Sequence, residues 1–171
     1  MILFAKLGRA TRLIFLKGAP SLAQKMAGNY RMGHRKWRGL DVTIENAAGT
    51  VRTGTHRDGS PWSTNMVNDY GYIRRTIGVD GQHVDCFLGP DPSAKYVYIV
   101  HQRKHGEWYT YDEDKVLLDF PSKRDALVCF LTHYDDPRFL GEMSVLPCEE
   151  FKRRVLETPN KAKYERKIEA L

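Results

Sequence analysis

The pattern of apolar and polar residues changes character along the chain, and each change marks a predicted boundary. Residues 2–16 carry apolar side chains at helical spacing, and residues 21–26 have the pattern of a second short helix. Residues 28–39 are basic, aromatic and glycine-rich, which is typical of a connector. From residue 40 onward, short apolar–polar alternations take over and predict half-buried β-strands.

The middle of the chain predicts many short strands separated by turns. Residues 40–45 alternate as a strand does, residues 46–49 form a turn signal, and residues 50–54 are the expected hairpin partner. Further strand patterns follow at residues 70–77, 84–89, 96–100, 108–111 and 115–118. Strands this short and closely spaced favour a small OB-like curled β-barrel of roughly five strands.

Helical periodicity returns toward the C-terminal end. Ser122 is a good N-cap for a helix over residues 123–133, and residues 149–157 and 161–171 predict two more helices. We therefore expect an α+β fold that is mainly β, with helices packed outside the barrel. Its expected parts are a basic helical arm (residues 1–27), the barrel domain (residues 28–147) and a C-terminal helical tail (residues 148–171).

Charge is distributed unevenly between the arm and the body. Residues 1–40 hold nine Lys or Arg and no Asp or Glu, whereas residues 41–148 hold eleven basic and sixteen acidic residues. The overall net charge of +6 therefore describes the arm and not the body. An acidic body suits a hard-cation site. A basic arm suits nucleic acid, phosphate or an acidic partner surface.

Composition also bears on the compartment and on membranes. The three cysteines form no CxxC pair, which argues against a disulfide framework and predicts a reducing, cytoplasmic setting. No stretch approaches the ~20 consecutive apolar residues that a membrane-spanning helix needs, so we expect no membrane span. Tyr30 and Trp37 in the basic connector are able to stack on single-stranded nucleic acid, although packing against the barrel is the favoured interpretation.

Two aspartates provide the first candidate chemistry. Asp80 and Asp85 flank a glycine-containing turn, which lets two carboxylates converge. Converging carboxylates repel each other unless a cation lies between them, and Mg²⁺ prefers such oxygen ligands. A second acidic cluster, residues 112–114, opens a later strand. On these residues alone, an ordinary Asp-Gly turn is the alternative interpretation.

An ordered set of motifs resembles the family I inorganic pyrophosphatases. Asp69-Tyr-Gly-Tyr-Ile73 is similar to their Asn-Tyr-Gly-Tyr-Ile strand, and Asp80-Gly-Gln-His-Val-Asp85 is similar to their Asp-Gly-Asp-Pro-hydrophobic-Asp signature. Motifs in residues 29–34, 39–46 and 112–116 extend the likeness to a phage-associated, pyrophosphatase-like family. The resemblance covers about residues 28–145 and implies the same barrel fold.

The resemblance implies a metal site with catalytic residues around it. Asp80 and Asp85 match the paired metal carboxylates of the signature, and Glu113 matches the third. Asp112 and Asp114 are possible substitutes within the same acidic cluster. The implied cofactor is Mg²⁺, with Mn²⁺ as an alternative ion. Asp80 and Asp85, together with Gln82 between them, are therefore the candidate catalytic residues.

The same resemblance implies a set of phosphate ligands. Lys115 matches a phosphate-contacting lysine, and Tyr70 matches a tyrosine that lines the phosphate pocket. Tyr134 matches a tyrosine that binds the leaving phosphate, and Arg52 is in the right strand for the arginine that clamps phosphate. The implied substrate is pyrophosphate or a nucleotide phosphate.

Two residues depart from the family pattern. Gln82 replaces an aspartate that helps to deprotonate the attacking water, and a Gln amide cannot accept that proton. Asp135 replaces a lysine that contacts phosphate, and Arg138 is a candidate substitute for that cation.

Two functions therefore stay open on the sequence. The first is Mg²⁺-dependent hydrolysis of inorganic pyrophosphate or a related phosphoanhydride. The second is a phage-encoded or virion-associated binding protein that keeps the fold with weak or no turnover. In that case the protein acts in the bacterial host cell or in the virion, and its basic arm binds nucleic acid or a virion partner. The sequence does not indicate an oligomeric state.

Overall fold

The computed structural model describes residues 32–156. The helices predicted for residues 2–16, 21–26 and 161–171, and with them the basic arm, lie outside the described residues. In chain order the elements are β1 (Gly33–Trp37), β2 (Leu40–Asn46), β3 (Val51–Thr55), β4 (Pro61–Asn65), β5 (Asp69–Ile73), β6 (Val84–Leu88), β7 (Tyr96–Lys104), β8 (Glu107–Leu118), α2 (Lys123–Thr132), the 3-10 helix η1 (Pro137–Phe139), β9 (Met143–Pro147) and α3 (Cys148–Leu156).

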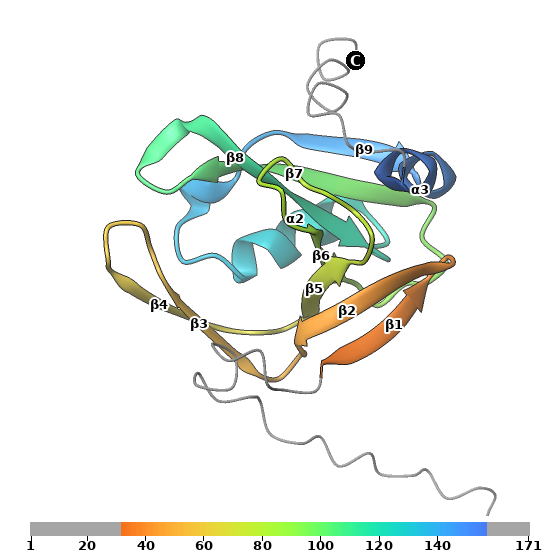
Figure 1. The fold of residues 1–171 in the computed structure, drawn as a ribbon, viewed down its shortest axis with the longest axis horizontal. Helices are drawn as coiled ribbons and strands as arrows, with labels where there is room; N and C mark the ends of the chain where they lie inside the picture. The colour runs from red at the N-terminus through yellow and green to blue at the C-terminus, as the bar shows by residue number, and fades with distance from the viewer. Residues whose placement is uncertain (1–31, 157–171) are drawn as a thin grey trace, which may run out of the picture.

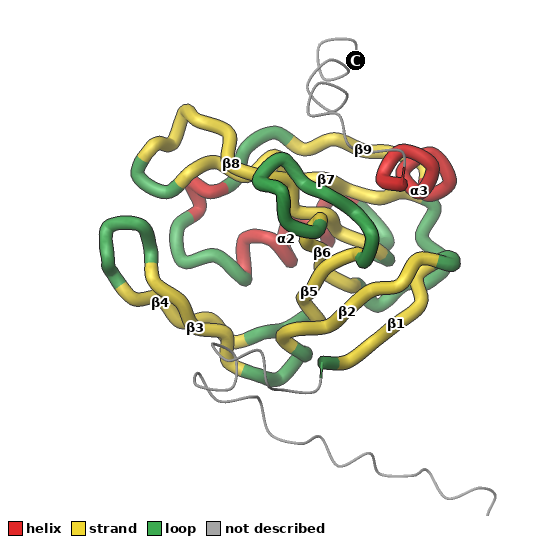
Figure 2. Tube along the Cα trace, viewed as in Figure 1, coloured by secondary structure: helices red, strands yellow, loops and turns green. Residues whose placement is uncertain are grey.

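Most of the strands join in one curled sheet (Figure 1). Its seven strands run in the order β1-β2-β5-β6-β8-β7-β9, with β6 and β8 parallel and the other neighbours antiparallel. β3 and β4 form a separate two-stranded hairpin, seen in Figure 2 as yellow strands standing away from the main sheet. The mainly β, OB-like α+β fold is thus confirmed, with the sheet curled as a half-barrel and with more strands than the sequence predicts.

Three local predictions differ from the structure. Residues 50–54 do not return along β2, because β1 and β5 already pair with its two edges, and β3 pairs with β4 instead. Part of the predicted connector is strand β1, whereas the favoured packing of Trp37 against the barrel is confirmed, because Trp37 is buried in the core. The patterns at residues 108–111 and 115–118 belong to one long strand, β8.

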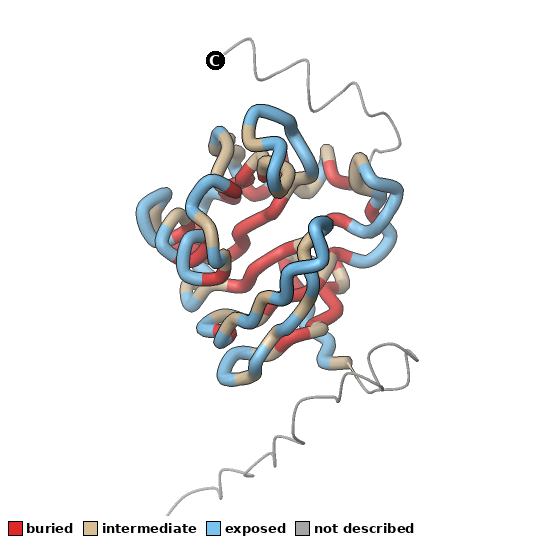
Figure 3. The backbone as a smooth tube through the Cα atoms, turned by 90° about the vertical axis from the view of Figure 1, so that its left-hand side faces the viewer, coloured by how far each residue is buried: buried red, intermediate tan, exposed pale blue. Residues whose placement is uncertain are grey.

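Each face of the curled sheet buries an apolar cluster. On one face α3 packs Phe151 against strand residues that include Val116. On the other face α2 packs Phe130 against strand residues that include Leu117. Successive strand residues point to opposite faces, which is why Val116 and Leu117 belong to different clusters. Figure 3 shows the buried strand interiors in red between exposed loops.

Within the described residues, helices α2 and α3 lie close to their predicted positions. Ser122 caps α2, as predicted, by accepting a hydrogen bond from the Asp125 backbone N–H at 3.2 Å. α3 follows directly after the predicted boundary at residue 147 and packs on the sheet. Among residues 32–156 we find no helix that is long and apolar enough to cross a membrane.

Candidate active site

Three neighbouring strands place candidate residues on one face of the sheet. Tyr70 lies on β5, Asp85 on β6 and Lys115 on β8, and these strands are adjacent in the order β5-β6-β8. Asp85 pairs in register with Lys115. Alternation puts Asp85 and Lys115 on the same face as Phe87 and Leu117, which is the face that α2 covers.

Close packing between strands explains why the middle residue of the Tyr-Gly-Tyr motif is glycine. A Cβ atom at Gly71 would lie 1.8 Å from the backbone oxygen of Thr43 on β2, so only glycine permits this approach. β2 and β5 pair closely at this point. The adjacent Tyr70 is consequently held in the sheet with its side chain buried.

Lys115 is the centre of a buried polar cluster. Its ammonium group donates to the Asp85 carboxylate at 2.5 Å and to the Tyr70 hydroxyl at 3.1 Å, and it pairs with the Glu113 carboxylate at 2.8 Å. The Tyr70 hydroxyl donates to Asp85 at 2.5 Å. Because the Lys115 side chain is only 4% exposed, one desolvated cation is shared by two carboxylates that would otherwise repel each other.

Burial and the neighbouring oxygen atoms together set the protonation of this cluster. Burial alone lowers the pKa of Lys115, but the surrounding phenol and carboxylate oxygen atoms outweigh it and raise that pKa well above its usual range. Burial raises the pKa of Tyr70, and it raises the pKa of Tyr134 to about 12. Burial also raises the pKa of Glu113, against the effect of Lys115. At neutral pH the cluster therefore presents an ammonium group and protonated phenols.

Arg52 brings a second cation to the cluster from the β3–β4 hairpin. Its guanidinium carbon lies 4.3 Å from the centre of the Tyr70 ring and 5.0 Å from the centre of the Trp62 ring. Its Nη2 atom is 3.5 Å from the Tyr70 hydroxyl. Cation–π contacts with two rings hold the guanidinium in place, so Arg52 reaches the Lys115 cluster although β3 belongs to a separate sheet.

A pocket of about 480 Å³ opens over this cluster. Arg52, Glu113, Lys115 and Tyr134 all line it. Tyr134 follows α2 and stacks on Phe130, with 4.2 Å between the ring centroids, which fixes its orientation. The walls come from the β3–β4 hairpin, the end of β7, the middle of β8, and the segment from the end of α2 to η1.

A β-bulge in β8 brings a further carboxylate into the pocket. Gln102 lies opposite Glu113, and the register slips by one residue just beyond this pair, so Asp112 is the extra residue of the bulge. Asp112 lines the pocket together with Glu113. It accepts a hydrogen bond from the Gln102 amide at 3.2 Å.

Asp114 lies outside the pocket. Its carboxylate contacts His101 Nδ1 at 2.6 Å, and His101 Nε2 contacts the Ser144 hydroxyl at 2.7 Å. This network connects β8, β7 and β9. Of the three acidic residues in the cluster, Asp112 and Glu113 therefore line the pocket, whereas Asp114 is held in this separate network.

Gln102 is a pocket residue that sequence reasoning missed. Its side chain is buried, and its amide oxygen has no hydrogen-bond partner among the described residues. A buried acceptor without a partner is costly, and it suits a donor or a cation from a bound ligand. No local pattern marks this residue, because only the bulge and the pocket distinguish it from its strand neighbours.

The predicted signature turn is less closely connected to the cluster. Asp80 and Gln82 are exposed in the turn before β6, and the Asp80 carboxylate accepts a hydrogen bond from the Gln82 backbone N–H at 2.9 Å. Within residues 32–156 no hydrogen bond or ion pair joins either residue to Lys115 or Asp85. Over the same part of the chain, no three His, Cys, Asp or Glu side chains form a ready metal site.

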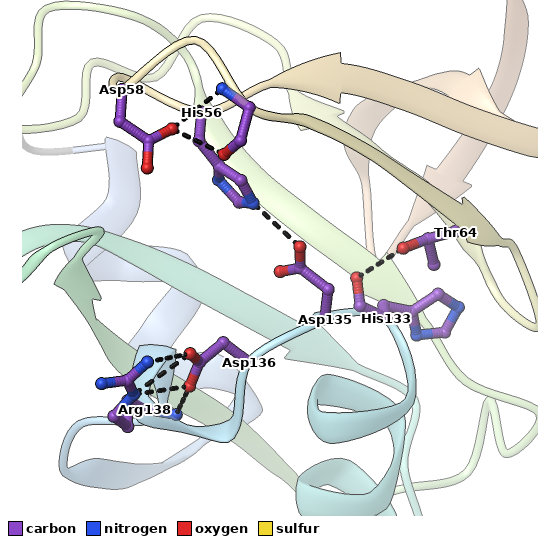
Figure 4. A network of polar contacts seen from close by, with 8 residues as sticks. His56, Asp58, Thr64, His133, Asp135, Asp136 and Arg138 are labelled. Carbon is purple, nitrogen blue, oxygen red and sulfur yellow. Dashed lines mark hydrogen bonds and ion pairs between the residues drawn. The ribbon is translucent and has the colours of Figure 1, made fainter.

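Asp135 makes a contact that the sequence does not indicate. Figure 4 shows its carboxylate turned toward His56 of the β3–β4 hairpin, with 2.8 Å between Oδ2 and Nε2. Arg138 does not replace the missing lysine in the pocket, because its guanidinium is held by the Asp136 carboxylate and lies over the Trp108 ring. The contact between Asp135 and His56 instead joins two walls of the pocket.

Arg52 and Lys115 line the same pocket, with the Tyr134 hydroxyl beside them, and arginine and lysine side chains are the usual phosphate ligands in proteins. A family model described as inorganic pyrophosphatase matches residues 22–156. Because this match covers well over half of the chain, the protein belongs to the inorganic pyrophosphatase family. A search of curated protein sequences found no match.

Proposed function

We propose that this protein hydrolyses inorganic pyrophosphate or a related phosphoanhydride, such as a nucleotide phosphate, with Mg²⁺ as its cofactor. The observation that carries the proposal is the buried Lys115 cluster, in which Asp85 and Glu113 share one ammonium group at the pocket. Membership of the inorganic pyrophosphatase family supports the reaction type.

The cations of the pocket supply electrostatic stabilisation in this proposal. Lys115 and Arg52 line the pocket and would hold phosphate oxygens, and an arginine fork is able to bind two of them at once. Such groups are more effective in a preorganised, partly buried site than in water. The protonated Tyr134 hydroxyl would donate to the leaving phosphate. Water attacks one phosphorus atom, the bridging P–O bond breaks, and two phosphates leave.

The oxygen-rich donor set fits a hard divalent cation. Asp85, Asp112 and Glu113 offer carboxylates near the pocket, and the buried amide oxygen of Gln102 lacks a partner among the described residues. Mg²⁺ is usually held by one or two carboxylates, waters and substrate phosphates, so a complete protein cage is not required. We assign Asp85 and Glu113 as ligands, joined by Asp80 from the turn, with Mn²⁺ as an alternative ion. A bound ion of this kind acidifies the attacking water.

Phosphate release from pyrophosphate, with and without Mg²⁺, tests the proposed reaction. We expect Mg²⁺-dependent release in the wild type and a large loss in Lys115→Ala. Titration calorimetry with Mg²⁺ tests the metal ligands separately. We expect weaker binding in Asp85→Asn and wild-type binding in Asp114→Asn, a matched control outside the pocket. Equal affinity in Asp85→Asn and wild type would contradict the metal assignment.

A second candidate function is binding without efficient turnover. Gln82 cannot act as a base, and Asp135 contacts His56 where the family has a phosphate-binding lysine. A protein of this kind binds pyrophosphate but releases little or no phosphate at any Mg²⁺ concentration. A phage-encoded or virion-associated role and a cytoplasmic location stay predictions.

The basic arm is proposed to bind nucleic acid or a virion partner. Its residues 1–27 lie outside the described part of the chain, so the proposal rests on charge alone. Phosphate contacts make such binding steeply dependent on salt concentration. Deleting residues 1–27 should therefore weaken nucleic-acid binding and flatten its salt dependence. A truncated protein that binds as well as the full chain would contradict this role.

A further inference from the structure

The pocket has an aromatic end that hydrolysis of a bare diphosphate does not use. Trp62, His56, His105 and Phe139 line this outer wall. The His56 and His105 rings stack, with centroids 4.0 Å apart and an interplanar angle of 6°. Phe139 lies 5.9 Å from the His56 ring and 5.8 Å from the His105 ring. Flat, polarisable surfaces of this kind are suited to stacking on a planar organic group.

Trp62 connects the aromatic wall to the phosphate-binding cations. It lies opposite Gly54 in the β3–β4 hairpin, and a Cβ atom at Gly54 would be 2.3 Å from the indole. The missing side chain therefore lets the indole lie directly on strand β3. Arg52 is 5.0 Å from one ring of Trp62, and the His56 and Trp62 ring centroids are 6.4 Å apart. A continuous band thus leads from Arg52 to the histidine stack.

The dimensions of the pocket exceed those that inorganic pyrophosphate needs. Arg52 and His56 both line the pocket. They are four residues apart on one extended segment, so their Cα atoms are about 13 Å apart. A chain of phosphates followed by a pentose bridges such a distance, whereas two linked phosphates do not. The volume of about 480 Å³ also falls in the range of roughly 300–1,000 Å³ that is typical of organic ligands.

We infer that the natural substrate of this pocket is a nucleoside triphosphate. Its phosphates lie at Lys115 and Arg52, and its base stacks on Trp62 and on the histidine pair. The inference rests on the proposed function for the bond that breaks. Water adds to the terminal phosphorus, the bridging P–O bond breaks, and its electron pair stays on the nucleotide. The products are a nucleoside diphosphate and inorganic phosphate.

Binding rather than turnover provides the primary test. The full chain is titrated by calorimetry with a non-hydrolysable β,γ-imido purine nucleoside triphosphate and, separately, with inorganic tripolyphosphate. We expect the nucleotide to bind more tightly than tripolyphosphate. Base–aromatic stacking predicts that Trp62→Ala weakens nucleotide binding about 5- to 150-fold, and weakens tripolyphosphate binding much less. Trp62→Phe should retain most of the nucleotide affinity, because it keeps an aromatic ring.

Trp108→Ala is the matched control. Trp108 packs edge-on against His105 and Phe139 but does not line the pocket, so its loss should leave the preference for nucleotide intact. Equal binding of nucleotide and tripolyphosphate to the wild type would overturn the inference. So would equal weakening of both ligands in Trp62→Ala. Phosphate release from pyrophosphate is scored separately. Turnover without a nucleotide preference overturns this inference and leaves the proposed function intact. Nucleotide binding through Trp62 without phosphate release from any ligand overturns the proposed hydrolysis and leaves only a nucleotide-binding site.

Discussion

The strand β8 and the turn before β6 both carry residues that match the family's catalytic pattern, but they hold them differently. On β8, Lys115 is buried and paired with carboxylates on both sides. In the turn, Asp80 and Gln82 are exposed, and the Asp80 carboxylate contacts the Gln82 backbone. Folding therefore buries and pairs the strand-borne groups, whereas the turn-borne groups stay exposed and make a contact that is local to the turn.

The largest expected effect comes from restoring a carboxylate to the turn. Gln82→Asp should raise pyrophosphate hydrolysis by about 10²–10⁴-fold, because general-base assistance is typically worth that much. The gain should be greatest near neutral pH and should shrink at higher pH, where hydroxide forms without a base. Steady-state rates of both proteins across a pH series provide the measurement. If Gln82→Asp is no faster at any pH while Mg²⁺ still binds, the binding-protein function becomes the better account.

The next largest effect should come from removing the buried cation. Lys115→Met leaves Asp85 and Glu113 without their shared partner, and breaking a buried pair in this way costs about 3–5 kcal/mol of the free energy of unfolding. Urea unfolding monitored by circular dichroism measures the loss. Lys95→Met, at an exposed lysine, is the matched control, and Asp80→Asn tests the turn. Similar losses of unfolding free energy in all three variants would contradict the proposed difference between the strand and the turn.

A smaller effect concerns how the cluster's surroundings respond to acid. The Nε2 atom of His133 accepts the Val67 backbone N–H at 2.9 Å, and its Nδ1 donates to the Cys129 carbonyl at 2.7 Å. Burial lowers the pKa of His133 below its ordinary value of 6.5. As pH falls through that value the unfolded chain takes up a proton before the folded protein does, so stability is lost. His133→Gln should show a shallower loss of stability between neutral and mildly acidic pH. An unchanged slope would contradict the buried, neutral imidazole.

The smallest expected effect concerns Glu113. Burial raises its pKa above the ordinary value of 4.5, so the folded protein stays protonated where the unfolded chain has already ionised. Its contribution to stability therefore falls as pH rises from 4.5 through the raised pKa. Glu113→Gln has no proton to lose and should become more stable relative to the wild type across that window. Parallel stability–pH curves for the two proteins would show that Glu113 ionises as it does in water.

Sequence patterns predicted much of the fold because alternation and helix capping depend on interactions between residues that are close in the sequence. Alternation at residues 40–45 and 96–100 corresponds to β2 and to part of β7, and the Ser122 cap marks the start of α2. The same patterns misplaced β3, because the choice between two antiparallel partners depends on which sheet edges are already occupied. β9 was missed because its burial is only intermediate, so its sequence lacks a strong alternation.

The sequence by itself determined that this chain has a pyrophosphatase-like core. Its motifs occur in the order that is characteristic of the family, and the order of motifs can be read without a structure. It also nominated Asp85, Glu113, Lys115, Tyr70 and Arg52, whose contacts the structure describes. Only the tertiary structure decided that Asp112 and not Asp114 lines the pocket, and that Gln102 and Trp62 belong to it. The physical reason is that a β-bulge and a docked hairpin bring together residues from distant segments, and the chain around each one carries no local sign of it.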